Sequence, residues 1–230
     1  MPVTDYLVRN AELYPDEVAL VELNPDEKDT RRTTWKEFDL IQPINNMPYR
    51  REITWSVFNE KANRFANMLL SRGVKKGDKV AILMYNCLEW LPIYFGVLKT
   101  GAIAVPFNFR YDSDEIYYCA ELAQVDVIVF GFAFIGRIEV NAERLSRGRL
   151  LIYVGDNCPS FAESYHELVA DCSSKEPDVK ITEDDYGAIY FSSGTTGFPK
   201  AILHKHQSLT QAAIMEQKHH STGRDDTFLC

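Results

Sequence analysis

The chain has 230 residues, of which 46% are apolar and 12% aromatic, so it can bury a hydrophobic core and is not a disordered segment. Its formal net charge of −8, without a concentrated basic stretch, argues against nucleic acid and anionic membranes as partners and favours a small-molecule ligand. The chain starts without a signal-peptide pattern, and charged residues interrupt its most apolar region, so no transmembrane segment is expected. Five widely spaced cysteines without a C-x-x-C pair indicate a reducing, cytoplasmic location.

Short apolar strands alternate with amphipathic helices along the chain. A helix is expected at residues 4–14 and a strand at 18–21, whereas the polar residues 24–50 predict an irregular insertion. A longer helix begins near residue 56 and ends before Gly73, which stands where a left-handed residue closes a helix. The later elements are predicted as strand 80–84, a helix capped by Asn86 and Glu89 and closed by Gly101, strand 102–107, a helix opened by Asp112 or Ser113, and strands 125–130, 150–154 and 186–191.

This alternation predicts the α/β class, with a mainly parallel β-sheet that helices cover on both faces. We divide the chain into a first α/β subdomain at residues 1–171, a charged connector at 172–185, and residues 186–230, which begin the part of the sheet that carries the candidate site. The last residues, 225–230, resemble the start of another strand, so the sequence is expected to stop inside the fold.

A segment rich in glycine and hydroxyl groups follows strand 186–191. It combines two serines, two threonines, two glycines and one lysine, namely Ser192, Ser193, Gly194, Thr195, Thr196, Gly197 and Lys200. Glycines let backbone N–H groups approach a ligand, hydroxyls donate to phosphate oxygens, and the lysine adds positive charge. Because open α/β sheets bind ligands beyond the carboxyl ends of their strands, the segment is predicted to hold the phosphates of a nucleotide.

The spacing of this segment differs from that of a Walker P-loop. Its pattern is Gly-x-x-Gly-x-x-Lys, and Pro199 before Lys200 hinders direct passage into a helix whose dipole would face the phosphate. A Walker NTPase is therefore disfavoured. Composition alone also leaves open a flexible turn that binds nothing.

The segment from Ser192 to Lys200 resembles the signature of the adenylate-forming, or AMP-binding, enzymes, which include acyl-CoA synthetases, luciferases and peptide-synthetase adenylation domains. Three residues depart from the usual pattern, namely Phe191, Ser192 and Ala201, and none of them removes a phosphate donor. The resemblance covers most of the chain and includes residues 15–20, 53–55, 73–80 and 89–101. Residues 94–102 and 105–108 are most similar to the acyl-CoA synthetase, or fatty-acid–CoA ligase, branch.

The resemblance implies a two-step reaction. A carboxylate attacks the α-phosphate of Mg-ATP to give an acyl-adenylate and pyrophosphate, and the thiol of coenzyme A then displaces AMP. ATP, Mg²⁺ and coenzyme A are therefore the expected substrates and cofactors, with Thr195, Thr196 and Lys200 as the main phosphate contacts. Relative to the family, the chain corresponds to the N-terminal portion only, so it contains no complete catalytic set and is expected to be inactive by itself.

The remaining candidate residues carry weaker signals. The resemblance places His206 near the adenylate and acyl pocket, so we expect it to line the substrate site, whereas His204 is not assigned a role. No set of histidines, cysteines and carboxylates has metal-ligand spacing, and the acidic residues 183–185 are expected to be a solvated run. Cys87 has no neighbouring base and is expected to be an inert thiol.

Besides an acyl-CoA ligase, the sequence allows two other functions. The chain could be a non-catalytic α/β nucleotide-binding module that keeps the phosphate segment without chemistry. A kinase or another phosphotransferase is a third possibility, but it predicts acidic metal ligands near Lys200 that the sequence lacks. A sheet face left bare in a partial chain also predicts self-association.

Overall fold

The computed structural model of the protein describes residues 1–23, 50–192, 199–224 and 226–228. The strands are β1 (Val18–Leu23), β2 (Arg50–Thr54), β3 (Lys79–Leu83), β4 (Ile103–Pro106), β5 (Val127–Gly131), β6 (Leu150–Val154), β7 (Glu163–Ser164), β8 (Tyr186–Ser192) and β9 (Lys200–Lys205). The helices are α1 (Val3–Leu13), α2 (Trp55–Ser71), α3 (Trp90–Lys99), α4 (Ser113–Leu122), the short 3₁₀ helix η2 (Phe132–Phe134), α5 (Ile135–Glu139), α6 (Ala142–Leu145), α7 (Tyr165–Ala170) and α8 (His206–His220).

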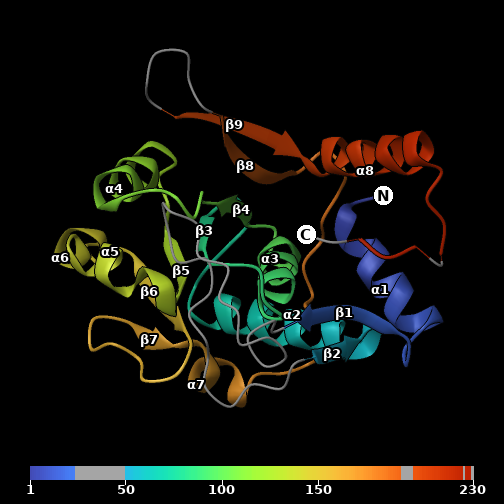
Figure 1. Ribbon diagram of the computed structural model, residues 1–230, viewed down its shortest axis with the longest axis horizontal. Coiled ribbons are helices and arrows are strands. Elements are labelled where there is room, and N and C mark those ends of the chain that lie inside the picture. Colours follow the sequence, from blue (N-terminus) through green and yellow to red (C-terminus); the bar gives the residue numbers. More distant parts are fainter. Residues whose placement is uncertain (24–49, 193–198, 225, 229–230) are drawn as a thin grey trace, which may run out of the picture.

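Seven strands form one sheet in the order β7-β6-β5-β3-β4-β8-β9, and β1 and β2 form a separate antiparallel pair (Figure 1). Every pairing in the large sheet is parallel except that of β8 with β9. The predicted α/β class with a mainly parallel sheet is therefore confirmed. Because neighbouring parallel strands share a direction, the turns that follow β3, β4, β5 and β8 all leave the sheet at one edge, the carboxyl edge.

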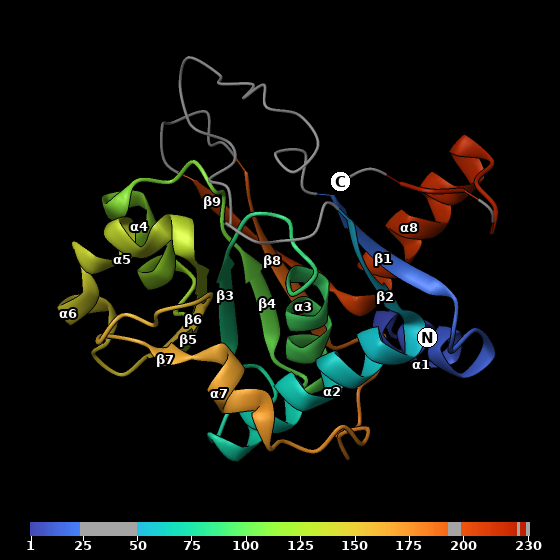
Figure 2. The same cartoon turned by 60° about the horizontal axis from the view of Figure 1, so that its bottom comes forward.

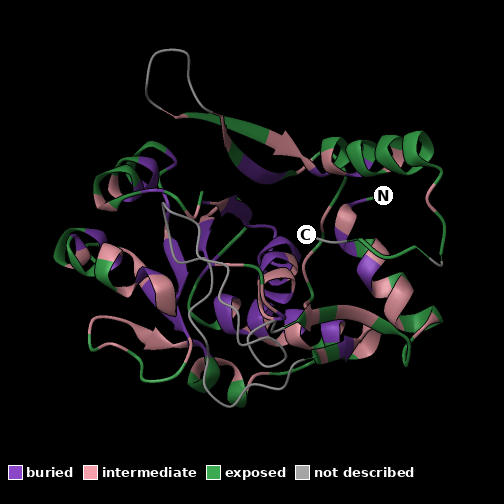
Figure 3. Cartoon of the chain, viewed as in Figure 1, coloured by how far each residue is buried: buried purple, intermediate pink, exposed green. Residues whose placement is uncertain are grey.

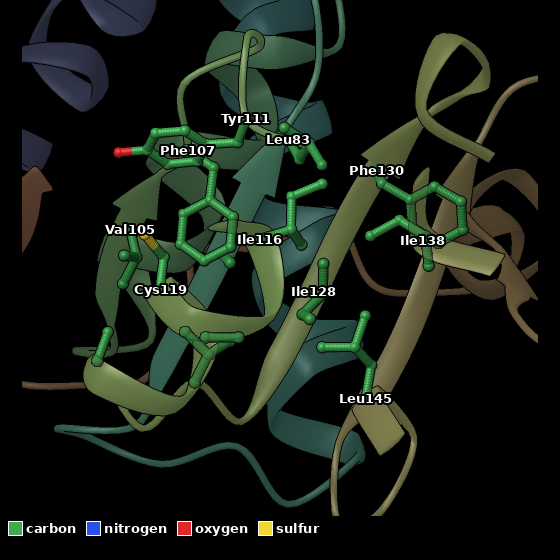
Figure 4. Packing of buried hydrophobic residues seen from close by; sticks show 14 of the residues in the cluster. Leu83, Val105, Phe107, Tyr111, Ile116, Cys119, Ile128, Phe130, Ile138 and Leu145 are labelled. Carbon is green, nitrogen blue, oxygen red and sulfur yellow. The ribbon is translucent and has the colours of Figure 1, made fainter. Parts of the chain in front are cut away.

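Helices cover both faces of the sheet, as Figure 2 shows. On one face α2, α3 and α7 bury a cluster that includes Phe65, Leu69 and Ile93. On the other face α4, α5 and α6 bury a second cluster, in which Ile116 and Ile138 pack between helices and strands (Figure 4). The near-continuous apolar strands of this sheet follow from that double cover. No helix in the described part of the chain is both long and apolar enough to cross a bilayer.

Several helix ends follow the local sequence signals. The Asp112 side chain accepts bonds from the first turn of α4, and Glu115 completes the capping box. Gly73, after α2, has a φ of +84°, which is the predicted left-handed conformation. The cap of α3 is different from the prediction, because its N-cap is Glu89, without a side-chain cap bond, and Asn86 lies before the helix.

Helices α2 and α3 approach each other closely at Gly96. A Cβ atom at this position would lie 2.8 Å from the carbonyl oxygen of Ala62 and 2.9 Å from Cδ1 of Phe65. Both distances are shorter than van der Waals contact, so only glycine fits here without moving the backbone. This contact presses α2 against α3, and α3 in turn packs on the sheet beside β4.

The predicted boundaries agree with the structure to different degrees. The predicted insertion at residues 24–50 lies outside the described residues, apart from Arg50 at the start of β2. Residues 226–228 form no strand, so the expected final strand is wrong for these residues. Residues 172–185 contain no helix or strand, but the strands on either side of them belong to the same sheet. The division into two subdomains therefore stays a prediction.

The connector at residues 172–185 is fastened to α2 by side chains that reach its backbone. The amide of Asn63 donates to the Ser174 carbonyl (3.0 Å), and the amide of Asn67 donates to the carbonyls of Ser173 (2.7 Å) and Lys175 (2.9 Å). These bonds satisfy carbonyl groups that have no place in a helix or strand. They hold the path by which the chain returns to the sheet and enters β8.

Candidate functional site

Strand β8 ends at the carboxyl edge of the sheet, where the predicted phosphate-binding segment begins. Ser192 is the last residue of β8 and pairs with Lys200, the first residue of β9. The structure therefore brings together the two ends of the predicted segment. The central residues of the segment, Ser193, Gly194, Thr195, Thr196 and Gly197, lie outside the described residues, and their contacts with phosphate stay a prediction.

Pairing on both sides fixes the position of β8. Ala188 pairs with Ala104 of β4 in the parallel direction, and β9 pairs along the opposite side of β8. Ala188 and Ile189 are buried, so the middle of the strand lies in the core. A strand held in this way cannot slide without exposing its apolar side chains, which gives Ser192 a defined place.

Aromatic rings anchor the residue immediately before Ser192. The ring of Phe191 lies 5.8 Å from that of Phe107 and 6.4 Å from that of Tyr111, both in edge-on contact. Phe107 and Tyr111 belong to the turn between β4 and α4 and are buried in the cluster shown in Figure 4. Such contacts each contribute about 0.5–1.5 kcal/mol beyond area burial. The carboxyl ends of β4 and β8 are thereby packed together.

Polar and aromatic groups meet on the opposite face of β8. The hydroxyl groups of Tyr94 and Tyr190 are 2.9 Å apart, and the His204 ring contacts Tyr190 edge-on at 5.4 Å. Burial raises the pKa of Tyr94 far above its usual range, so this phenol remains protonated and able to donate. The pair links α3 to β8 through one hydrogen bond.

The two lysines at the ends of β9 have different surroundings. Lys205 lies 3.1 Å from the carboxylate of Asp184. Lys200 is exposed and has no carboxylate within ion-pair distance among the residues that the structure describes. An unpaired ammonium beside a strand end offers charge and three donors to an anionic ligand. Among the described residues, then, Lys205 has an acidic partner and Lys200 has none, which makes Lys200 the better candidate for binding phosphate.

His206 lies far from this strand end. Its side chain is fully buried beside Gly187, at the beginning of β8, and its backbone N–H donates to the Asp185 carbonyl at 2.9 Å. Ser192 lies five positions after Gly187 in β8, which corresponds to about 17 Å along a strand. The structure thus does not bring His206 next to Ser192 and Lys200. Its predicted role in the substrate pocket stays a prediction.

The environment of His206 favours a neutral imidazole. Neither ring nitrogen has a hydrogen-bond partner among the described residues. Burial lowers the pKa of His206 below its usual value of 6.5; the nearby carboxylate of Asp185 acts in the opposite direction, and the ammonium of Lys76 acts with burial. The buried His206 ring thus lies at the junction of β8 with α8, where burial favours its neutral form.

The described residues contain no group of three histidines, cysteines or carboxylates that could hold a metal ion. Two residues of the acidic run, Glu183 and Asp184, are exposed, as predicted, and all three of its carboxylates also lie within ion-pair distance of a cation. Asp185 lies 2.6 Å from Lys76, Asp184 pairs with Lys205, and Glu183 pairs with the amino terminus. These ion pairs attach the residues directly before β8 to neighbouring parts of the chain.

Cys87 behaves as an inert thiol. Burial, together with the nearby carboxylate of Glu89, raises its pKa to about 12. A protonated thiol is a poor nucleophile near neutral pH. The structure therefore supports the expectation that Cys87 takes no part in chemistry.

No pattern in the sequence indicated the network around Lys99. Its buried ammonium group donates to Asn59 and Asn63 of α2, each at 2.8 Å, and to both oxygens of Glu176 in the connector, at 2.6 and 2.7 Å. The only sign of this network in the sequence is a single lysine within an apolar helix. Its partner could not be named because Glu176 lies 77 residues further along the chain.

Residues 7–230 of the chain match the family described as AMP-binding enzyme. The chain is 33% identical over 162 residues to a long-chain-fatty-acid–CoA ligase, FadD13, of Mycobacterium tuberculosis, an alignment that covers 70% of this chain and 31% of that protein. It is 31% identical over 171 residues to a 3-hydroxybenzoate–CoA/4-hydroxybenzoate–CoA ligase of Thauera aromatica, covering 74% of this chain and 32% of that protein. The matched regions thus span about a third of each relative.

The fold is also similar to that of a solved CoA ligase. The anthranilate–CoA ligase AuaEII, in complex with anthranoyl-AMP, superposes with a TM-score of 0.77 and 25% sequence identity. The superposition covers 93% of this chain and 36% of that protein. Nearly the whole chain therefore corresponds to one part of a longer enzyme fold.

Proposed function

Because the chain belongs to the AMP-binding enzyme family, we propose that it is the amino-terminal portion of an ATP-dependent acyl-CoA ligase. The whole ligase activates a carboxylic acid as its acyl-adenylate with release of pyrophosphate. It then transfers the acyl group to the thiol of coenzyme A with release of AMP. The observation that carries the proposal is the place of the family's signature segment, whose two ends, Ser192 and Lys200, pair at the carboxyl edge of the sheet.

Phosphate binding is the contribution that we assign to this portion of the enzyme. The hydroxyl of Ser192 and the ammonium of Lys200 lie at one rung of the ladder and can converge on the phosphate oxygens of ATP. Thr195 and Thr196 complete the proposed set on the strength of the family signature. Enzymes that transfer adenylyl or phosphoryl groups act chiefly by positioning phosphates and by stabilising the charge that develops on them, so donors and a cation are the groups required.

Magnesium enters this proposal only with ATP. The described residues do not gather the carboxylates that a protein-bound magnesium ion needs, so no step depends on such a site. The acid is assigned only to the class of carboxylic acids, because the matched relatives are named for fatty and aromatic acids. Fatty acid metabolism is thus one of the settings that the proposal allows.

The proposal is tested by titrating the chain with Mg-ATP in a calorimeter. We expect binding to the wild-type chain, a loss of about tenfold in affinity for Lys200→Met, and little change for the matched control Lys205→Met. Lys205 lies on the same strand but pairs with Asp184. Equal affinities in all three proteins would remove Lys200 from the site, and an absence of ATP binding by the wild-type chain would contradict the proposed function.

We further propose that the chain alone does not turn over, since its matched regions span only a third of the relatives. Incubation with ATP, Mg²⁺, coenzyme A and a panel of fatty and aromatic acids should release no pyrophosphate above the blank. Release well above the blank would overturn this statement. A longer form of the protein that binds ATP and also fails to release pyrophosphate would favour the alternative of a non-catalytic nucleotide-binding module.

Self-association is proposed through β9. This strand is the outer one of the sheet in the described chain, and its Ile202 and Leu203, which point to opposite faces, are 45% and 44% exposed. An apolar edge strand offers unpaired backbone groups to a second copy. Sedimentation at several concentrations should show a dimer that forms as concentration rises, whereas one monomeric species throughout would contradict the proposal.

A cytoplasmic location is also proposed. The described cysteines Cys87, Cys119, Cys158 and Cys172 are all free thiols, as expected in a reducing compartment, and the proposed substrates ATP and coenzyme A are available there. Cell fractionation with antibody detection tests this. Recovery of the protein with secreted material would contradict it.

A further inference from the structure

Arg137 of α5 reaches across to the turn that follows β4. One nitrogen of its guanidinium group donates to two backbone carbonyls of this turn, those of Phe109 (2.6 Å) and Tyr111 (3.0 Å). The turn is closed further by the Tyr111 backbone N–H, which donates to the Asn108 carbonyl at 3.0 Å. Two carbonyls that converge on one donor hold the turn in a single shape.

The same turn carries the rings that pack on the end of β8. Tyr111 and Phe107 are buried and both contact Phe191, the residue before Ser192. The contacts therefore run without a gap from Arg137, through the turn, to Phe191 and the Ser192–Lys200 rung. Because Phe191 and Ser192 are adjacent, a shift of the ring changes the direction in which the strand end points.

The guanidinium of Arg137 is held by these contacts and not by an acidic partner. Its carbon lies 5.5 Å from the centre of the Phe134 ring, and no carboxylate of the described chain is within ion-pair distance. Phe134 packs on Tyr85 of the turn after β3 at 5.1 Å, so Arg137 bonds the turn after β4 directly and is linked to the turn after β3 through the Phe134 ring. A cation placed in this way serves to join turns, since its hydrogen bonds go to backbone carbonyls.

We propose that Arg137 is a positioning residue for phosphate binding, which acts through the 107–111 turn and Phe191 on the Ser192–Lys200 rung. The inference rests on the proposed function and adds a residue that lies in a different helix from the phosphate segment. Its action is geometric, because Arg137 bonds the backbone of the turn and Phe191 transmits the shape of the turn to the strand end. Loss of the guanidinium is expected to loosen this end of β8.

A double-mutant cycle tests the proposal. Arg137→Met and Phe191→Leu should each weaken Mg-ATP binding about tenfold, and the double variant should lose little more than one of them, because both changes break the same chain of contacts. Arg144→Met is the matched control, since the Arg144 guanidinium stacks on Tyr117 at 3.8 Å and donates to the side chain of Asn141 rather than to carbonyls of the turn. Losses that multiply, or an unchanged affinity in Arg137→Met, would overturn the proposal even if the melting temperature fell.

Hydrogen exchange of the ligand-free protein separates this inference from the proposed function. Arg137→Met should speed exchange at residues 186–192 and 200–205, and Arg144→Met should not. If the wild-type chain binds no ATP but this difference appears, the proposed function fails and the link from Arg137 to the strand end stands. Unchanged exchange in Arg137→Met would refute the link. Arg137→Lys keeps a cation with N–H donors, so its ATP affinity and its exchange rate should lie between those of the wild type and those of Arg137→Met. It replaces Arg137→Met in both measurements if that variant does not fold.

Discussion

The central strands of the sheet are buried more completely than the β8–β9 hairpin and helix α8. Every residue of β5 is buried, and so are four of the five residues of β3. Helix α8, in contrast, is mostly exposed (Figure 3) and buries only His206 and Thr210, and its Met215 is 62% exposed. The central block is a packed core, whereas β9 and α8 form a peripheral unit joined to it by β8, whose middle residues are buried.

Besides the pairing of β8 with β4, a small number of specific side-chain contacts hold the peripheral unit to the block. The hydroxyl pair of Tyr94 and Tyr190, the ring contacts of Phe191, and the ion pair of Lys76 with Asp185 are among them. The Ser192–Lys200 rung lies on this unit, at its junction with the block. The candidate site therefore combines a fixed sheet edge with a strand end whose position depends on a few side chains.

The largest expected effect comes from the block itself. Gly96→Val places branched carbon atoms where a single Cβ would already lie 2.8 Å from the Ala62 carbonyl oxygen, so α2 and α3 must separate. We expect a loss of about 3 kcal/mol in the free energy of unfolding, measured by urea titration. Gly136→Val is the control, because nothing lies within 4 Å of a Cβ there. A loss of the same size in both variants would show that the α2–α3 contact is not the cause.

A smaller loss is expected when the connector is released from the block. Lys99→Met removes the donor that satisfies Asn59, Asn63 and Glu176, and the free energy of unfolding should fall by about 2 kcal/mol because those oxygens lose their shared partner. The half-exposed carboxylate of Glu176 regains water, which limits the loss. The exposed Lys175→Met serves as the control, and exchange at residues 172–180 should rise only in Lys99→Met. Equal stability of the two variants would contradict the network.

The hydrogen bond between the hydroxyl groups of Tyr94 and Tyr190 can be removed by a substitution that keeps the aromatic ring. Tyr190→Phe leaves the buried Tyr94 hydroxyl without its partner, and a loss of about 1 kcal/mol is expected in urea titration. Tyr186→Phe, on the same strand and 49% exposed, is the matched control. If both variants unfold at the same urea concentration as the wild type, the pair contributes no stability and the hairpin is held by other contacts.

The smallest effect is a pH dependence at the root of α8. Since burial lowers the pKa of His206 below 6.5, the unfolded chain binds the proton more readily than the folded protein once the pH falls below this value. The imidazole therefore adds no pH dependence above 6.5 and costs stability as the pH falls from 6.5 toward the folded pKa. Urea titrations between these limits should show a shallower decline for His206→Leu than for the wild type. The exposed His219→Leu should keep the wild-type decline, and identical slopes in all three would contradict the burial of a neutral imidazole.

Local signals in the sequence predicted most of the individual elements. The capping box at Asp112 and the left-handed Gly73 act within a few residues, so their effect can be read directly. The order of the strands could not be read, because the position of β8 beside β4 depends on contacts between residues far apart in the chain. The short β7 also escaped prediction, since two residues carry no periodicity.

Only those parts of the candidate site whose residues lie close together in the sequence could be predicted. The phosphate segment combines its donors within nine residues, and its place at a strand end follows from the alternation of strands and helices. The supports of Lys99 and Arg137 could not be predicted, because a long polar side chain reaches backbone or side-chain partners that the fold alone brings near. The separation of His206 from Ser192 follows from the antiparallel return of β9, which the sequence pattern did not specify.

Hydrogen exchange with and without Mg-ATP tests most directly whether phosphate is bound where the hairpin meets the sheet edge. We expect the nucleotide to protect residues 186–192 and 200–205 from exchange and to leave exchange in the exposed helix α8 and at the α2–α3 contact unchanged. Protection confined to any other part of the chain, with none at the Ser192–Lys200 rung, would contradict the assignment of this strand end as the ATP-binding site.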